Sequence, residues 1–92
     1  MSKSIQENNN ECFLCGSQRC LETHHIFGGA NRDLSEKYGL TVRLCHFCHN
    51  EPPFGAHHNR DTDLLLKRLG QEEFEKRYPD KSFIEIFGRN YL

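Results

Sequence analysis

The chain has 92 residues, of which 12 are lysine or arginine and 13 are aspartate or glutamate, so its formal net charge is −1. This length allows one small domain, whose hydrophobic core is marginal unless a disulfide, a metal ion or a partner adds stability. The sequence has no apolar run of about 18 residues, which argues against a membrane-spanning helix. The lack of a basic excess argues against a protein that coats DNA nonspecifically.

The first ten residues, MSKSIQENNN, are polar and contain no apolar segment like that of a secretion signal. We therefore expect residues 1–10 to be a flexible tail and residues 11–92 to form a single domain of a cytoplasmic protein. In a reducing compartment, paired cysteines bind metal ions more often than they form disulfides.

Four of the five cysteines lie in two C-x-x-C pairs, in ECFLCG and LCHFCH; they are Cys12, Cys15, Cys45 and Cys48. Each pair can present two thiolates from one tight turn, and two such turns complete a tetrahedral site for a structural zinc ion. The segment between the pairs is longer than in a simple zinc ribbon, which indicates a folded insertion. A redox-active C-x-x-C is the alternative, but the chain is too short for a thioredoxin-like fold. We expect the remaining Cys20 to be a small buried residue or a free thiol.

Two strands and a helical turn are predicted between the cysteine pairs. LETHHIF at 21–27 is rich in β-branched and aromatic residues, and LTVRL at 40–44 alternates apolar and polar residues. In NRDLSEKYG, Asp33 and Glu36 have the spacing of a capping box, and Gly39 suits a left-handed helix exit. These elements predict a small α+β fold.

The C-terminal part of the chain is predicted to be helical. NEPPFG at 50–55 predicts a turn or loop because consecutive prolines resist regular structure. Apolar residues then recur at helical spacing over 59–78, with Gly70 as a point where the helix bends or splits and Pro79 as its end. A capping box from Ser82 predicts a short final helix ending at Gly88.

The motifs CFLC, THHIFGG and RLCHFCH, in this order, resemble the zinc-bearing members of the HNH nucleases, the ββα-metal or His-Me finger family. The resemblance covers about residues 11–60, and the stretches NRDLSEKYGL and FIEIFGRNYL are similar to small HNH proteins of bacteriophages and prophages. It implies a ββα-metal fold and a metal-dependent endonuclease that hydrolyses DNA phosphodiester bonds to 5′-phosphate and 3′-hydroxyl ends.

The resemblance also implies roles for individual histidines. In the family, the first residue of the strand pair binds a divalent ion and the second is the general base, which implies His24 as a ligand and His25 as the base. The histidine after the second cysteine pair, His49, would be the second ligand. The third would be His57, with His58 as the alternative, because the usual position is occupied by a proline. The ion would be Mg²⁺, Mn²⁺, Ni²⁺ or Zn²⁺.

Elementary chemistry is compatible with these roles. A neutral imidazole can accept a proton near neutral pH, and one divalent ion can act as the Lewis acid on the scissile phosphate. Adjacent side chains of a strand point to opposite faces. His24 and His25 can therefore share a site only where the strand ends or bulges, which the glycines Gly28 and Gly29 would allow.

The chain departs from the family in the position of its middle asparagine, which braces the loop that carries the base. This chain has Leu40 there; Asn31 is a candidate substitute, although it is equally a turn residue. Arg32 and Arg43 are candidate phosphate contacts, since guanidinium matches phosphate geometry. They belong to a set of basic residues that could equally form a basic face or plain solvated surface: Arg19, Arg32, Lys37, Arg43, Arg60, Lys67 and Arg68.

Three functions are compatible with these observations. The first is an HNH endonuclease acting on DNA, with a phage or host protein supplying specificity because the chain has little room for a sequence-reading domain. The second is a non-catalytic zinc-binding module that binds nucleic acid or a protein. The third is a second structural metal site built from the same histidines, while His57 and His58 alone could also be polar surface residues at the start of a helix.

Overall fold

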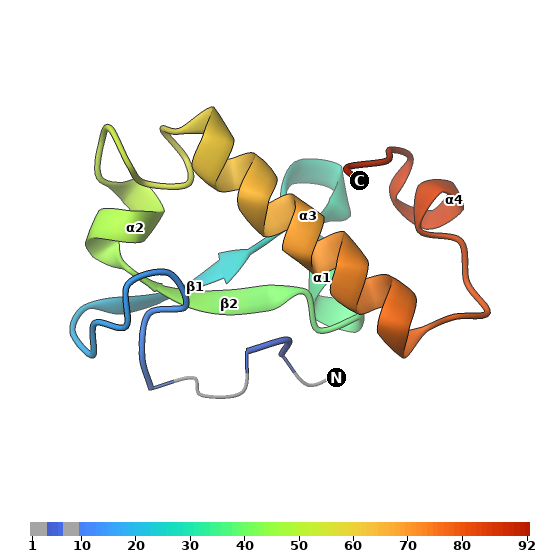
Figure 1. Ribbon diagram of the computed structural model, residues 1–92, viewed down its shortest axis with the longest axis horizontal. Coiled ribbons are helices and arrows are strands. Elements are labelled where there is room, and N and C mark those ends of the chain that lie inside the picture. The colour runs from blue at the N-terminus through green and yellow to red at the C-terminus, as the bar shows by residue number, and fades with distance from the viewer. Residues whose placement is uncertain (1–3, 7–9) are drawn as a thin grey trace.

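The computed structural model describes residues 4–6 and 10–92, which form an α+β structure with one two-stranded sheet (Figure 1). None of the helices among these residues combines the length and apolar character needed to cross a membrane. The elements follow in the order β1 (Leu21–His25), the 3-10 helix η1 (Gly29–Asn31), α1 (Arg32–Lys37), β2 (Thr41–Cys45), α2 (His46–Asn50), α3 (Arg60–Arg77) and α4 (Phe83–Phe87).

The two strands pair antiparallel, and their register separates a buried from an exposed face. His24 lies opposite Val42, and both side chains are buried. Thr23 lies opposite Arg43, and these side chains are in the more accessible positions of their strands. The helix α3 runs obliquely past the strands in Figure 1 and supplies the buried Leu66 and Phe74. The alternation predicted for the second strand is therefore present.

The helix α3 is continuous, so the predicted break at Gly70 does not occur. The side chain of Asn59 caps its first turn, and it ends before Pro79, as predicted. A Cβ atom at position 70 would lie 3.1 Å from side-chain atoms of Ile26 and Phe27. Glycine at this position thus allows α3 to approach the segment that follows β1, which is the reason for its presence inside a helix.

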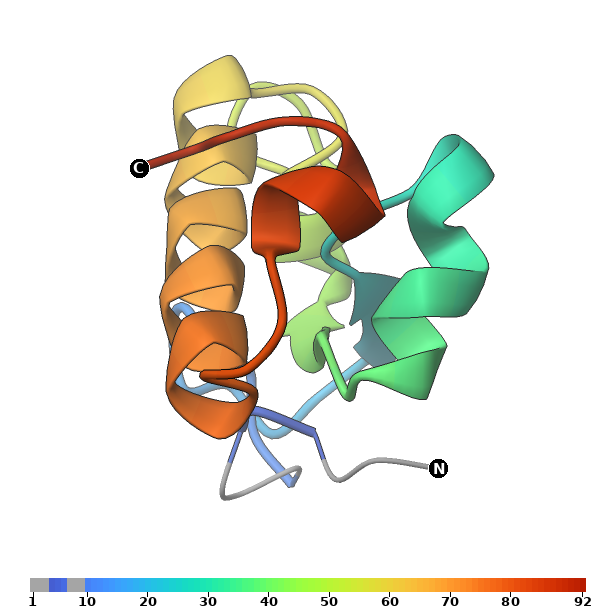
Figure 2. The same cartoon turned by 90° about the vertical axis from the view of Figure 1, so that its right-hand side faces the viewer.

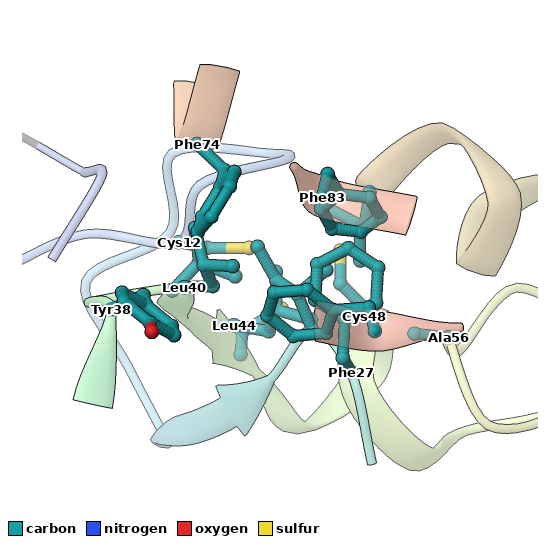
Figure 3. Packing of buried hydrophobic residues seen from close by; sticks show 14 residues of the cluster. Cys12, Phe27, Tyr38, Leu40, Leu44, Cys48, Ala56, Phe74 and Phe83 are labelled. Atoms are coloured by element: carbon teal, nitrogen blue, oxygen red, sulfur yellow. The ribbon is translucent and has the colours of Figure 1, made fainter. Parts of the chain in front are cut away.

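Aromatic side chains from distant segments make up much of the core (Figure 3). Phe27, after β1, lies 5.2 Å from Phe83 and 4.9 Å from Phe87, measured between ring centroids. Phe74 of α3 lies 5.1 Å from Tyr38. Figure 2 shows α4 between α3 and α1. Its two phenylalanines, Phe83 and Phe87, are buried and contact Phe27 and Phe74. The apolar residues of the two C-terminal helices therefore serve the core in part: Leu66, Phe74, Phe83 and Phe87 are buried, whereas Leu65 and Ile84 are exposed.

The two predicted capping boxes have different outcomes. Ser82 accepts a hydrogen bond from the Glu85 backbone N–H at 3.3 Å, and α4 ends at Gly88 in the left-handed conformation, as predicted. The prediction for Asp33 is wrong, because α1 already begins at Arg32 and continues from the preceding 3-10 turn without a side-chain cap. Gly39 does have the expected positive φ, of 72°.

Other boundaries also differ from the predictions. The first strand ends at His25 rather than at Phe27, because Ile26 and Phe27 turn into the core. The helix α2, which contains the second half of LCHFCH, was not predicted; a five-residue helix has too few turns to show a periodic pattern. Cys20 is exposed, so the expectation of a buried residue is wrong, while a free thiol agrees with the structure.

The N-terminal segment is partly packed on the sheet. The Ser4 hydroxyl donates to the Thr41 carbonyl at 2.6 Å, and the buried Gln6 side chain accepts a hydrogen bond from the Arg43 backbone N–H at 2.7 Å. Residues 4–6 thus contact β2, and the flexibility expected of residues 1–10 stays a prediction. Residues 1–3 and 7–9 lie outside the described part of the chain.

Candidate metal centres

The two cysteine pairs come together at one end of the sheet. In the first, the Gly16 backbone N–H bonds to the Cys12 carbonyl at 2.9 Å, and the Cys15 N–H points to the Cys12 sulfur at 3.4 Å. The neighbouring Phe13 N–H bonds to the Arg43 carbonyl of β2 at 2.8 Å. This bond fixes the first turn beside the strand that leads directly into the second pair.

The second pair begins at Cys45, which ends β2, and its other member lies one turn into α2. The four cysteine sulfurs all lie within 4.8 Å of one another, and the Cys15 and Cys45 sulfurs are 3.6 Å apart. Four sulfur ligands around a tetrahedral zinc ion are separated by about 3.8 Å. The four thiols could therefore hold a structural metal ion, and zinc is one of the ions that suit a set of four thiolates.

Electrostatics within the cluster favour a thiolate at Cys12 but not at Cys15 or Cys48, whose pKa values are raised. Burial opposes ionisation of Cys12, but hydrogen bonds from backbone N–H groups, chiefly those of Cys45 and Cys15, bring the pKa of its thiol down to about 7. Burial raises the pKa of the Cys48 thiol. A bound cation would relieve this cost, since the thiolate is the form that binds a metal.

Three histidines form a second cluster, and one of them, His49, follows Cys48 directly on α2. His24 comes from β1, His49 from α2 and His57 from the loop before α3, and one ring nitrogen from each lies within 4.8 Å of the other two. The His49 and His57 Nε2 atoms are 3.0 Å apart. His57, rather than the alternative His58, is thus the histidine that the structure brings to the predicted pair.

His24 gives the strongest indication that this cluster fits a metal ion. Its side chain is only 3% exposed, yet neither ring nitrogen has a hydrogen-bond partner among the described residues. A buried polar atom without a partner costs free energy, so it normally has one. Burial, together with the neighbouring His49 and His57, lowers the pKa of His24 to about 3, which keeps its imidazole in the neutral form that a metal ion requires.

His25 is the last residue of β1, so the predicted condition for two adjacent histidines at one site is met. Its side chain borders the same open pockets as His24 and His57, one of which has a volume of about 330 Å³. Its Nε2 lies 3.1 Å from a carboxylate oxygen of Glu36 on α1. If Nε2 carries the proton, Nδ1 is left as the basic atom of the ring.

The segment after His25 is held by a residue that the sequence analysis missed. The buried Ser35 hydroxyl accepts a hydrogen bond from the Phe27 N–H at 3.0 Å and donates to the Phe27 carbonyl at 2.7 Å. Asn31, the predicted brace, instead donates to the Phe87 carbonyl at 3.1 Å and ties the loop to α4. Leu40, at the family's asparagine position, is fully buried in the core.

Glu22 is a second residue that sequence reasoning did not identify. Its carboxylate oxygens lie 2.7 Å from His49 Nδ1 and 3.2 Å from His46 Nδ1, and Asn50 Nδ2 donates to it at 3.3 Å. Hydrogen bonds from His49 and then His46 lower the pKa of Glu22. The signal available in the sequence was its position two residues before His24, which places both on one face of a strand.

The two arginines predicted to contact phosphate lie in different places. Arg32 borders the pocket that also contains His25, His49 and His57. The Arg43 guanidinium donates to the Thr23 hydroxyl at 3.0 Å and borders a separate pocket on the exposed face of the sheet. Only Arg32 is therefore beside the histidine cluster, and a phosphate contact by either residue stays a prediction.

The comparisons with known proteins add no assignment. No family model, no curated protein and no solved structure gives a significant match to this chain.

Proposed function

We propose that this chain is a metal-dependent endonuclease of the HNH type that hydrolyses DNA phosphodiester bonds. One observation carries the proposal: the three histidines expected to bind the ion lie together, and His25, the expected base, borders the same open pocket. The order of β1, β2 and a following helix around this pocket is also the order expected of a ββα-metal fold. The resemblance of residues 11–60 supplies the reaction type.

The residues around the pocket support distinct roles in hydrolysis. His25 would take a proton from water as the water oxygen bonds to phosphorus, and Glu36 would hold the imidazole in the required orientation. The bond from phosphorus to the 3′-oxygen breaks, and that oxygen takes a proton from solvent. Arg32 would contact the phosphate from the side of α1.

His24, His49 and His57 would hold the ion. When bound, it would act as a Lewis acid on the phosphate oxygens. Three imidazoles suit Zn²⁺ or Ni²⁺ better than Mg²⁺, which prefers oxygen ligands. We therefore expect Ni²⁺ or Zn²⁺ to occupy this cluster more tightly than Mg²⁺ does.

A plasmid-nicking assay with Mg²⁺, Mn²⁺, Ni²⁺, Zn²⁺ or EDTA tests the proposal on the full chain. We expect metal-dependent nicking that His25→Ala reduces by about 100-fold or more, since general base catalysis typically contributes 10²–10⁴-fold. Thermal unfolding and zinc content of the variant should match the wild type, because His25 is not a cysteine-site ligand. A folded, zinc-loaded wild type that cuts with none of these metals would contradict the proposal.

A non-catalytic nucleic-acid or protein-binding module is the second candidate, and one observation favours it. Phe47 on α2 and Phe54 in the following loop are 51% and 58% exposed, and their ring centroids are 5.8 Å apart. Exposed aromatic rings of this kind can stack on unpaired bases. DNA binding without cleavage, lost in Phe47→Ala, would support this function instead.

A further inference from the structure

Glu22 connects the strand of the histidine cluster to the helix that carries one of its ligands. It lies on β1 two residues before His24, so both side chains leave the same face of the strand. One of its oxygens is 2.7 Å from His49 Nδ1, the shortest of the contacts made by this carboxylate. Asn50, the neighbour of His49, donates to the same oxygen at 3.3 Å.

This contact determines which nitrogen of His49 faces the cluster. A carboxylate accepts hydrogen bonds only, so the 2.7 Å contact calls for Nδ1–H on His49. Asn50 Nδ2 also lies 3.3 Å from this Nδ1, but it is a donor and has the Glu22 oxygen as its acceptor. The proton then resides on Nδ1, and the other ring nitrogen, Nε2, keeps its lone pair. That Nε2 points into the cluster, 3.0 Å from His57 Nε2.

We propose that Glu22 is a positioning residue for the histidine metal site, fixing the tautomer and orientation of His49 so that its Nε2 is available to the ion. The inference rests on the metal site of the proposed function and adds a residue to it. Metal-binding histidines commonly donate their second ring N–H to a carboxylate, which orients the ring and raises its basicity.

A purely structural role is the competing explanation, because Glu22 also joins β1 to α2. Glu51 provides the control for this explanation. Its carboxylate lies 3.0 Å from His46 Nε2, and His46 is also a partner of Glu22, but no contact links Glu51 to His49 among the described residues. A Glu51 variant therefore removes a carboxylate that contacts His46 on α2 but leaves the surroundings of His49, the proposed ligand, unchanged.

The test compares Glu22→Ala, Glu22→Gln, Glu51→Ala and Glu51→Gln with the wild type, each carrying one zinc ion at the cysteine site. Ni²⁺ affinity is measured by calorimetry and by competition with a chelator, and the His49 tautomer of the nickel-free protein by ¹H–¹⁵N NMR of the imidazole. We expect Glu22→Ala to weaken Ni²⁺ binding by about 10- to 100-fold and to lose the predominance of the Nδ1–H form. Glu22→Gln retains a hydrogen-bond acceptor, so its Ni²⁺ affinity should fall less than that of Glu22→Ala. The Ni²⁺ affinities of the Glu51 variants should match that of the wild type.

Each outcome decides the inference. Equal Ni²⁺ affinities for Glu22→Ala and Glu51→Ala would overturn it, as would a wild-type His49 protonated mainly at Nε2. If Glu22→Ala fails to fold, Glu22→Gln and the wild-type tautomer still decide. A wild type that binds Ni²⁺ but cuts no DNA would contradict the nuclease and leave the Glu22 result valid, whereas a wild type that binds no Ni²⁺ beyond the cysteine site would contradict both.

Discussion

The cysteine cluster and the histidine cluster differ in how the chain surrounds them. Three of the four cysteines are buried and belong to the hydrophobic core, so most of this cluster is enclosed by protein and only Cys15 is exposed. In the histidine cluster only His24 is buried, while His57 is exposed and open pockets adjoin the ligands. Structural zinc sites are closed, and catalytic sites keep a position for water or substrate. The difference therefore favours stability as the role of the first cluster and chemistry as the role of the second.

The histidine cluster also depends on the cysteine cluster through the helix α2. The helix α2 begins directly after Cys45 and contains both Cys48 and His49. A metal ion on the thiols would hold this helix in place and thereby position a histidine ligand. Loss of the cysteine site should therefore remove both sites, whereas loss of the histidine site should leave the fold intact.

The largest expected effect is that of Cys48→Ser. Structural zinc supplies about 10–16 kcal/mol of apparent binding free energy in small domains, which is as large as the whole stability of a typical domain. We expect the variant to bind no zinc tightly and to show no cooperative thermal transition by circular dichroism. Cys20→Ser is the matched control, because Cys20 is exposed and outside the cluster. A cooperatively folded Cys48→Ser protein would show that the cysteine site is dispensable.

The next largest effect should come from His57→Ala. This change removes one of three clustered ligands, so Ni²⁺ affinity at the histidine site should fall by more than the about 10- to 100-fold typical of outer-shell residues. The cysteine-bound zinc and the thermal transition should persist. His58→Ala is the control, since the structure groups His57 and not its neighbour with His24 and His49. Equal losses in the two variants would contradict His57 as the ligand, and loss of the zinc or of the thermal transition in His57→Ala would contradict the separation of structural and catalytic roles.

The smallest effect distinguishes the two arginines. Arg32→Ala should weaken DNA binding several-fold and reduce the slope of log affinity against log salt by about 1, as expected for one lost phosphate contact. Arg43→Ala should have the smaller effect, because this side chain lies on the other face of the sheet and bonds to Thr23. Fluorescence anisotropy with a short duplex at several salt concentrations measures both. A larger effect for Arg43 would place the DNA on the exposed sheet face.

Local patterns predicted much of the fold and one of the clusters. The two C-x-x-C pairs and the capping box at Ser82 are short-range signals, in which the interacting residues lie within a few positions of each other. The structure brings the four cysteines together and forms the predicted cap. The two wrong predictions, at Asp33 and Gly70, depend on neighbouring structure rather than on local pattern. At Asp33, a preceding 3-10 turn moved the start of the helix. At Gly70, close packing against Ile26 and Phe27 explains why a glycine lies inside a continuous helix.

The sequence by itself determined the cysteine donor set and the α+β character, because spacing and residue type carry that information. The pairing of His24 with His49 came from the resemblance to the HNH nucleases. Only the tertiary structure separated Arg32 from Arg43 and brought Glu22, Ser35 and Glu36 to their histidine or backbone partners. It also grouped His57, which the resemblance already preferred to His58, with His24 and His49. These contacts join residues from different elements. Their geometry depends on how the strands and helices pack, and no local pattern records that.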